Sequence, residues 1–222
     1  MRRKIKSYQT AALCWIAIIL PWLVGKMVIA SCPPGMAGCL DERVLQWFAT
    51  IRTKGLDQFF TSVTLVGSGF ILLSLAVAWS ARLLTLRLRR EAIFLCLATA
   101  GATLLPYLGK YLVARPRPAL LLAATDLPSG FSFPSGHATQ ITAFVLAGLW
   151  LLRRSTTSDR RFVIAAIAGG TLISLVCLSR LYLQFHYPSD VVAGVLTATF
   201  WVTGLASLIM DSAPHRDPTP LP

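Results

Sequence analysis

The chain has 222 residues, of which 55% are hydrophobic and only 14% are charged, and its formal net charge is +12. Soluble domains have about a quarter charged residues, so this composition argues against a soluble globular protein. On a soluble protein the positive charge would suggest a nucleic-acid partner. Here the basic residues lie in particular loops between apolar blocks, so we expect a membrane protein with no nucleic-acid partner.

Six apolar blocks follow one another along the chain. Blocks of about 20 apolar residues can cross a bilayer as helices. The predicted spans are Tyr8–Ala30, Phe59–Ala81, Ala92–Gly109, His137–Leu152, Phe162–Leu178 and Val191–Met210. We therefore expect an all-α fold, a six-span transmembrane helical bundle. Residues 1–212 form a single integral-membrane domain in this prediction, and the proline-rich residues 213–222 form a disordered cytoplasmic tail.

Lysine and arginine gather in alternate loops. These loops precede the first block, join the second to the third, and join the fourth to the fifth. Their basic residues are Arg2, Arg3, Lys4, Lys6, Arg82, Arg87, Arg89, Arg90, Arg153, Arg154, Arg160 and Arg161. Short loops rich in such residues stay in the cytoplasm. We expect a multi-pass protein of the bacterial cytoplasmic (inner) membrane, with both termini cytoplasmic and the other loops outside.

The first block has a second interpretation as a lipoprotein signal. Ile29-Ala30-Ser31-Cys32 follows basic residues and an apolar run, and cleavage before Cys32 would remove the first span. We favour a retained helix, because Lys26 interrupts the run and the run is long for a signal.

The first outward loop contains two features of structural interest. Cys32 and Cys39 flank PPGMAG and form either a disulfide, in an oxidising compartment, or two free thiols. In Asp41–Thr53 the apolar residues share one helical face, which predicts a short amphipathic helix on the outer membrane surface. These residues are Val44, Trp47, Phe48 and Ile51. The alternative is a helix packed on the bundle.

The segment KYLVARPRP, from Lys110 to Pro118, places three cations at the end of the third span. Proline disfavours helix for the residue before it, so the helix should end near Ala114 and the RPRP run should be extended. Arginine matches phosphate oxygens with a planar fork, and lysine offers a point charge. The alternative is that these cations reach towards lipid headgroups.

The segment FPSGHAT starts the fourth span. Ser135 is a good N-cap, and Gly136 lets a ligand approach the backbone closely. The free amides and positive dipole end of a helix N-terminus form an anion site, and His137 lies beside it in the first turn. The alternative is a simple capped helix with an interfacial histidine.

The segment SRLYLQFHYPSD joins the fifth and sixth spans. Arg180 leaves the fifth span, and Pro188 indicates that the sixth begins there. His186 then precedes the helix and Asp190 lies in its first turn, close enough for a carboxylate–imidazole hydrogen bond. Such a bond would fix the tautomer and leave the other ring nitrogen free to attack. The alternative is a pair that only caps the helix.

The predicted topology brings these three segments to one side of the membrane at the same depth. Cations, a helix N-terminus and two histidines, one with a carboxylate partner, describe a phosphoryl-transfer site. Asp126 and Asp190 are the only acids near the segments, and no Cys/His ligand set accompanies them. We therefore expect no metal and no other cofactor.

At these residues the chain resembles the type-2 phosphatidic acid phosphatase superfamily, in its integral-membrane lipid phosphatase branch. The superfamily pattern is Lys-x6-Arg-Pro, Pro-Ser-Gly-His and Ser-Arg-x5-His-x3-Asp, and this sequence has all three over about Gly109 to Gly194. The resemblance implies that His186 attacks phosphorus, that Asp190 orients it, and that His137 protonates the leaving oxygen. The implied phosphate ligands are Lys110, Arg117, Ser135, the Gly136 amide and Arg180. Arg115 is outside the pattern, and we expect only a headgroup or structural role for it.

The resemblance implies a metal-independent phosphatase that cleaves a lipid phosphate at the outer membrane face, with no obligate protein partner. Candidate substrates are undecaprenyl diphosphate, phosphatidylglycerol phosphate, phosphatidic acid and lipid A phosphate, and we favour undecaprenyl diphosphate or a similar lipid. A phosphotransferase would use the same residues with another acceptor. A non-enzymatic lipid-binding or transport protein would need functional polar groups near the middle of the membrane, where we find only Lys26.

Overall fold

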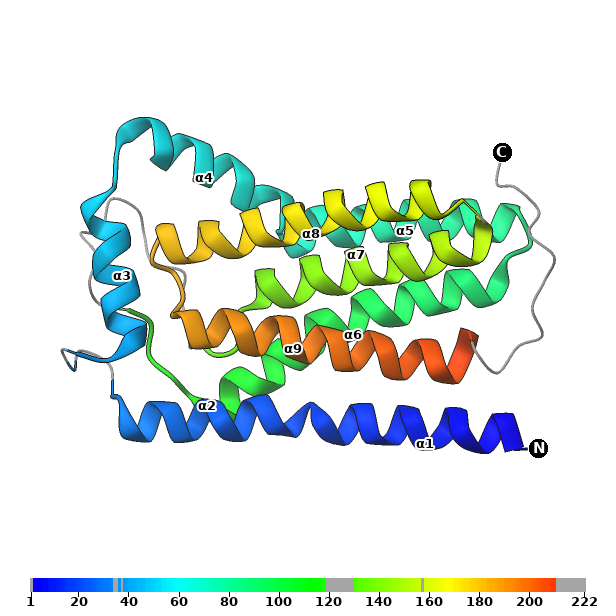
Figure 1. The fold of residues 1–222 in the computed structure, drawn as a ribbon, viewed down its shortest axis with the longest axis horizontal. Helices are drawn as coiled ribbons and strands as arrows, with labels where there is room; N and C mark the ends of the chain where they lie inside the picture. The colour runs from blue at the N-terminus through cyan, green and yellow to red at the C-terminus, as the bar shows by residue number, and fades with distance from the viewer. Residues whose placement is uncertain (1, 34–35, 37, 119–129, 157, 211–222) are drawn as a thin grey trace.

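The computed structural model describes residues 2–33, 36, 38–118, 130–156 and 158–210. Within these residues it contains helices and no strands (Figure 1), so the predicted all-α class is confirmed. The predicted tail lies outside the described residues. The helices are α1 (Arg2–Ala17), α2 (Ile19–Ser31), α3 (Leu40–Thr50), α4 (Lys54–Val66), α5 (Gly69–Thr85), α6 (Arg89–Val113), α7 (Gly136–Ser155), α8 (Asp159–Tyr182), α9 (Pro188–Leu205) and the π-helix η1 (Ala206–Met210).

Five stretches of the described chain are long and apolar enough to cross a membrane. They are Ile5–Ser31, Lys54–Thr85, Arg89–Val113, Asp159–Tyr182 and Pro188–Met210. The fourth predicted span corresponds to α7, which is not among the five. The first half of α7 carries polar residues, including Thr139 and Thr142, and these are buried inside the bundle. The count of six spans therefore stays a prediction.

Two of the predicted spans are each built from two helices. The first divides into α1 and α2 at Ile18, because Pro21 has no amide hydrogen for the carbonyl of Ala17. The second divides into α4 and α5 at Gly67 and Ser68, and the Ser68 hydroxyl caps α5 by accepting the Ile71 amide at 3.4 Å. Figure 1 shows α4 running at an angle to α5.

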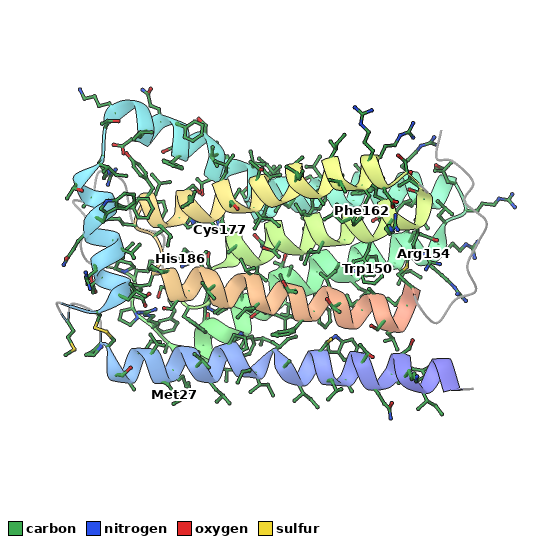
Figure 2. All side chains as sticks on the ribbon, in the orientation of Figure 1. Met27, Trp150, Arg154, Phe162, Cys177 and His186 are labelled. Carbon is green, nitrogen blue, oxygen red and sulfur yellow. A yellow bond between two sulfur atoms is a disulfide. The ribbon has the colours of Figure 1, made fainter. Side chains whose placement is uncertain are left out.

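Small side chains let the helices approach closely in the centre of the bundle. Helix α7 packs against α5, α6, α8 and α9. The core there contains fully buried alanines, which are Ala98, Ala102, Ala143, Ala147 and Ala198. Such residues are typical of packed membrane helices. Outside this core, large apolar side chains point away from the bundle (Figure 2), as surfaces facing lipid do, and Phe70 is 84% exposed.

The two ends of the bundle differ in chemistry. Figure 2 shows Arg154, in the last turn of α7 beside the basic loop that leads to α8, at the end opposite His186. The Arg154 guanidinium donates to the Met210 carbonyl at 3.1 Å, so the end of η1 lies beside this basic loop. The loop between α5 and α6 and the start of α1 lie at the same end (Figure 1). The basic loops and the predicted site thus occupy opposite ends of the molecule.

Helix α3 lies across the end of the bundle that holds His186. A disulfide between Cys32 and Cys39 joins the end of α2 to the residue before α3, and α3 packs against α8 and α9. The bundle covers the predicted apolar face of α3 only in part. Phe48 is buried, but Trp47 is 57% exposed, and the acidic Asp41 and Glu42 are buried instead. A helix packed on the bundle, the alternative interpretation, fits this burial, while its position at a membrane surface stays a prediction.

Candidate active site

The RPRP run forms an extended strap after α6. The helix ends at Val113, and Ala114 adopts the left-handed conformation with φ of 53°. The residues from Arg115 to Pro118 are not helical, as predicted from the two prolines. Ser132 holds the strap in place, since its amide donates to the Arg115 carbonyl at 2.8 Å and its hydroxyl to the Pro116 carbonyl at 3.0 Å.

Lys110 and Arg117 are held by backbone carbonyls. The Lys110 ammonium donates to the Phe131 carbonyl, and Arg117 donates to the carbonyls of Phe185 at 2.8 Å and Gly130 at 3.2 Å. Among the described residues neither cation makes an ion pair with an acid. Burial lowers the pKa of the Arg117 guanidinium, against a smaller opposing effect of the Asp190 charge. Both positive charges are therefore available to an anion.

Ser135 occupies the N-cap position of α7, as predicted, but its side chain makes no capping hydrogen bond. Its extended backbone fits the N-cap position, yet its fully buried hydroxyl has no hydrogen-bond partner among the described residues. A buried polar group without a partner is costly, which suggests that this hydroxyl serves a ligand. A Cβ atom added to the next residue, Gly136, would meet nothing within 4 Å, so the space beside its α-carbon is open.

His137 lies in the first turn of α7, next to this open space. It is within electrostatic reach of His186, Lys110, Arg117 and Arg180. The break between α4 and α5 approaches it from the other side, since a Cβ added to Gly67 would lie 3.5 Å from the His137 ring. The structure thus brings together the two histidines and three cations that the sequence predicts for the site.

Arg180 lies inside the last turn of α8, whereas the sequence predicted that it follows the helix. Its guanidinium is 4% exposed, donates to the Thr64 hydroxyl at 2.7 Å, and lies 4.5 Å from the centre of the Phe185 ring. Its Nε atom has no partner among the described residues. Thr64 belongs to α4, so a residue outside the three motifs also orients the site.

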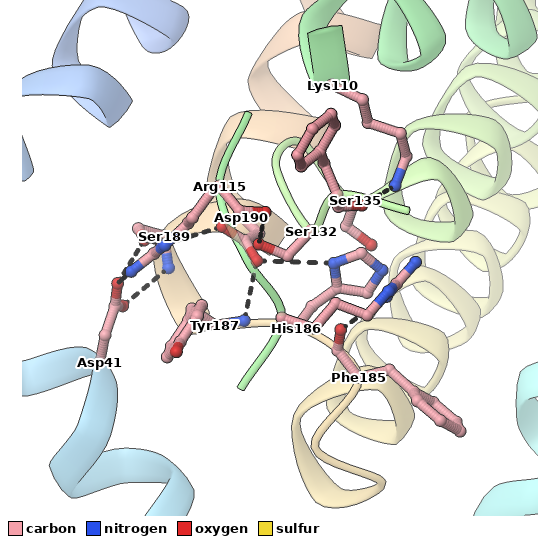
Figure 3. A network of polar contacts seen from close by, with 12 residues as sticks. Asp41, Lys110, Arg115, Ser132, Ser135, Phe185, His186, Tyr187, Ser189 and Asp190 are labelled. Carbon is pink, nitrogen blue, oxygen red and sulfur yellow. Dashed lines mark hydrogen bonds and ion pairs between the residues drawn. The ribbon is translucent and has the colours of Figure 1, made fainter. Parts of the chain in front are cut away.

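His186 and Asp190 face each other where α9 begins (Figure 3). The His186 Nδ1 atom lies 3.5 Å from the Asp190 Oδ2 atom, which is longer than a hydrogen bond, and Oδ2 also accepts the Tyr187 amide at 3.0 Å. Burial lowers the pKa of His186 to about 4, with Asp190 raising it and Arg180 and Arg117 lowering it further. The ring is therefore neutral at neutral pH, as a nucleophile must be.

Arg115 has the second of the two roles expected for it, the structural one. It does not face headgroups: it is 1% exposed and forms ion pairs with Asp190 at 2.7 Å and Asp41 at 2.8 Å. Burial alone would lower the pKa of its guanidinium, but the two carboxylates raise it above its usual value. One signal could have identified it, because a neutral imidazole cannot balance a buried carboxylate and Asp190 therefore needs a cation.

The chain is similar to a family of known proteins. Residues 91–213 match the model of the PAP2 superfamily. Phosphatidylglycerophosphatase B of Bacillus subtilis is 27% identical over 155 residues, which cover 69% of this chain and 75% of that protein. The undecaprenyl-diphosphatase of Sulfolobus acidocaldarius is 31% identical over 134 residues, which cover 59% of this chain and 60% of that protein.

A solved structure shares the fold. The transmembrane PAP2 type phosphatidylglycerolphosphate phosphatase from Bacillus subtilis superposes with a TM-score of 0.70 at 24% identity, over 89% of this chain and 93% of that one. Together with the apolar helices, this relative indicates a multi-pass membrane protein. The relatives are named as phosphatases, in agreement with the predicted enzyme class. The family model covers more than half of the chain and every predicted site residue, so the chain belongs to the PAP2 superfamily, as its three motifs predicted.

Proposed function

We propose that this protein is a metal-independent phosphatase that hydrolyses a phosphate monoester or diphosphate on a membrane lipid through a phosphohistidine intermediate. One observation carries the proposal. A buried, neutral His186 faces Asp190 beside the open N-terminus of α7, where the Ser135 hydroxyl has no partner among the described residues. Figure 3 shows Lys110, Ser135 and His186 converging on one region from different elements.

The first step is the transfer of the phosphoryl group to His186. The Nδ1 atom carries the ring proton and points at Asp190, so the Nε2 atom is the one that attacks phosphorus. A bond forms between Nε2 and phosphorus while the bond from phosphorus to the leaving oxygen breaks. His137 gives a proton to that oxygen, so the lipid leaves as an alcohol or as a monophosphate.

The second step is hydrolysis of the phosphoenzyme. Water attacks phosphorus, the bond from Nε2 to phosphorus breaks, and the water proton passes to His137, which is ready for the next turnover. Inorganic phosphate leaves. The ring of His186 is cationic while it carries the phosphoryl group, and the Asp190 carboxylate stabilises that charge.

Five groups hold the phosphate in this proposal. Lys110, Arg117 and Arg180 supply positive charge, and the hydroxyl of Ser135 and the amide of Gly136 donate hydrogen bonds. The first amides of a helix have no partner within the helix, and the positive end of the α7 dipole favours an anion. Charge that develops on the transferring group is stabilised by donors already in position.

The substrate class follows from the setting of the site. The chain is apolar, and its site lies at the bundle end opposite the basic loops, which positions it for a headgroup whose tail stays in lipid. The named relatives act on a glycerophospholipid phosphate and on a prenyl diphosphate. Both lipids carry a phosphate on a long apolar tail. We place the site on the outer face of the cytoplasmic membrane, within one six-span domain over residues 1–212 whose termini are cytoplasmic.

The test measures phosphate release by the purified protein in detergent with EDTA present. Undecaprenyl diphosphate, phosphatidylglycerol phosphate, phosphatidic acid and a lipid A phosphate are compared as substrates. His186→Ala should abolish release while the protein still elutes as a monodisperse species. Arg154→Gln, at the opposite end of the bundle, is the control variant and should retain activity.

Release that persists in His186→Ala would mean that another group is the nucleophile. No release from any of the four lipids would overturn hydrolysis as the function. A parallel reaction with dodecanol as acceptor then tests phosphoryl transfer, which would appear as dodecyl phosphate.

A further inference from the structure

The Asp190 carboxylate is shared between His186 and Arg115. Its Oδ2 atom faces the His186 ring at 3.5 Å, while its Oδ1 atom accepts the Arg115 Nη1 hydrogen at 2.7 Å. The carboxylate is fully buried. A change in the position of Arg115 would therefore rotate the oxygen that faces the nucleophile.

Arg115 is itself fixed on several sides (Figure 3). Its Nη2 atom donates to the Asp41 Oδ2 atom at 2.8 Å, and its Nη1 atom also donates to the Ser189 hydroxyl at 2.7 Å. The guanidinium lies over the Tyr187 ring, 3.8 Å from its centre. Ser189 closes the cluster, because its hydroxyl donates to Asp41 and its amide donates to the Asp41 Oδ1 atom at 3.0 Å.

The charges of this cluster do not cancel. Arg115 and Asp190 alone would form a neutral pair, and the carboxylate would then have little net charge left to act on His186. Asp41, which is 8% exposed, adds a second carboxylate to the same guanidinium. The three buried groups therefore carry one net negative charge. The ring of His186 acquires one positive charge when it is phosphorylated or protonated.

We propose that Asp41 and Arg115 are positioning residues for the nucleophile. Arg115 aims the Asp190 carboxylate at His186, and Asp41 balances the guanidinium so that the charge of Asp190 stabilises the cationic ring. This inference rests on the proposed function, since it assigns the cluster to the phosphohistidine step. It extends the site to α3, a helix outside the three motifs.

Other charged groups around His186 disfavour a positive charge on its ring, and the negative cluster has to offset them. Arg180 and Arg117 act on the ring as cations, and His137 lies within electrostatic reach of it. Glu42, next to Asp41 in α3, acts on Tyr187. Two cations close to the ring disfavour a third positive charge there. A net negative cluster on the side of Nδ1 offsets that repulsion.

The test separates the effect of charge from that of structure by comparing two variants that remove charges of opposite sign. Asp41→Asn keeps the shape and removes one negative charge, while Arg115→Met removes the positive charge. Protonation of His186 is followed by NMR on protein in detergent with isotope-labelled histidine, over a pH range that extends from 7 to well below the wild-type pKa of about 4. Asp41→Asn should lower the pKa of His186, and Arg115→Met should raise it. If the two residues had a purely structural role, the pKa of His186 would shift in the same direction in both variants.

Turnover supplies the second readout, with phosphatidic acid in detergent micelles as the probe. Asp41→Asn should lower kcat by roughly 10- to 100-fold, the range for loss of an outer partner of a functional histidine, with KM little changed. Arg115→Lys should retain more activity than Arg115→Met. Arg52 and Asp57 form an ion pair with 3.1 Å between their charged atoms, and this pair is the control for Arg115 and Asp41. Arg52→Met and Asp57→Asn should leave kcat and the pKa of His186 unchanged.

The inference would be overturned if the pKa of His186 shifted in the same direction in Asp41→Asn and Arg115→Met, or did not shift in Asp41→Asn. If Arg115→Met does not fold, Asp41→Asn and Arg115→Lys decide the question: the first must lower the pKa of His186 and the second must leave it nearly unchanged. A wild-type protein that releases no phosphate would defeat the proposed function, but the NMR comparison would still test the charge balance.

Discussion

The backbone amide of Ser135 donates a hydrogen bond of 3.0 Å to the carbonyl of Asp190. This bond joins the residue before α7 to the first turn of α9. The proposed phosphate-binding motif and the proposed nucleophile motif are therefore fixed to each other by main-chain atoms, and the distance between them depends on how closely α9 can approach the start of α7.

Gly194 permits that approach, and we expect Gly194→Ala to damage the site. A Cβ atom at this position would lie 2.7 Å from the Ser135 carbonyl oxygen and 3.0 Å from the Thr139 hydroxyl, so the backbone would have to move. A displacement of about 1 Å in a catalytic site can cost roughly 100-fold in rate, and we expect a loss of kcat of that order.

The matched control for this change is Gly170→Ala on α8, where an added Cβ meets nothing within 4 Å. Phosphate release and thermal melting in detergent should be unchanged or slightly improved there, because alanine favours helix. Equal activity of the Gly194→Ala and Gly170→Ala proteins would show that the spacing of α7 and α9 is not critical.

Ser135→Ala should reduce activity without reducing stability. The Ser135 hydroxyl is buried without a partner among the described residues, so its removal should leave the melting temperature unchanged or raise stability by about 1 kcal/mol. Loss of a phosphate donor should lower kcat/KM by about 100-fold. Ser132→Ala is the contrasting variant, because its hydroxyl donates to the carbonyls of Arg115 and Pro116 and its loss should lower the melting temperature. A destabilised Ser135→Ala protein would indicate a structural hydroxyl.

His137→Ala should affect substrates according to their leaving groups. A general acid contributes about 10²–10⁴-fold when the leaving oxygen needs a proton, and little when the leaving group is already stable as an anion. Phosphate release from a lipid phosphate monoester should therefore fall far more than release from p-nitrophenyl phosphate. Equal losses on both esters would contradict the acid role.

The stability of the folded protein should fall in acid because of His186. Burial lowers its pKa from 6.5 to about 4, so between these pH values the unfolded chain binds a proton that the folded chain does not. The contribution of His186 to the stability of the folded protein is therefore fully present above pH 6.5 and decreases as the pH falls towards 4. The melting temperature of the wild type should drop more over this window than that of His186→Asn, which cannot titrate there. If the melting temperatures of the two proteins fell in parallel with pH, the His186 ring would not be the cause of the loss of stability in acid.

Local patterns were sufficient to predict much of this molecule. Proline rules located the end of α6 near Ala114 and the start of α9 at Pro188, and apolar block lengths identified most of the helices. The sequence predicted that His186 and Asp190 lie close enough for a hydrogen bond; the structure brings them together, but at a separation of 3.5 Å, which is longer than a hydrogen bond. These features depend on residues that are close in the sequence or on one helical face.

The features that were missed depend on contacts between distant segments. The hydroxyl of Ser135 was expected to cap α7, but nothing local shows that it stays unpaired. The apolar pattern of α3 accounts for the burial of Phe48 but not for that of Asp41, which pairs with Arg115, 74 residues away. Thr64 reaches Arg180 across 116 residues. No periodicity within a single helix contains this information.

The position of Asp41 has a consequence for the modularity of the chain. The family model begins at residue 91, so Asp41 lies outside the matched region, as do the disulfide and the whole of α3. The three motifs are thus not a self-sufficient module in our proposal. A fragment that began at Glu91 would retain every motif residue and would leave the Arg115 guanidinium with one carboxylate in place of two. In our proposal the N-terminal segment is more than a membrane anchor, since Asp41 completes the charge around the proposed nucleophile.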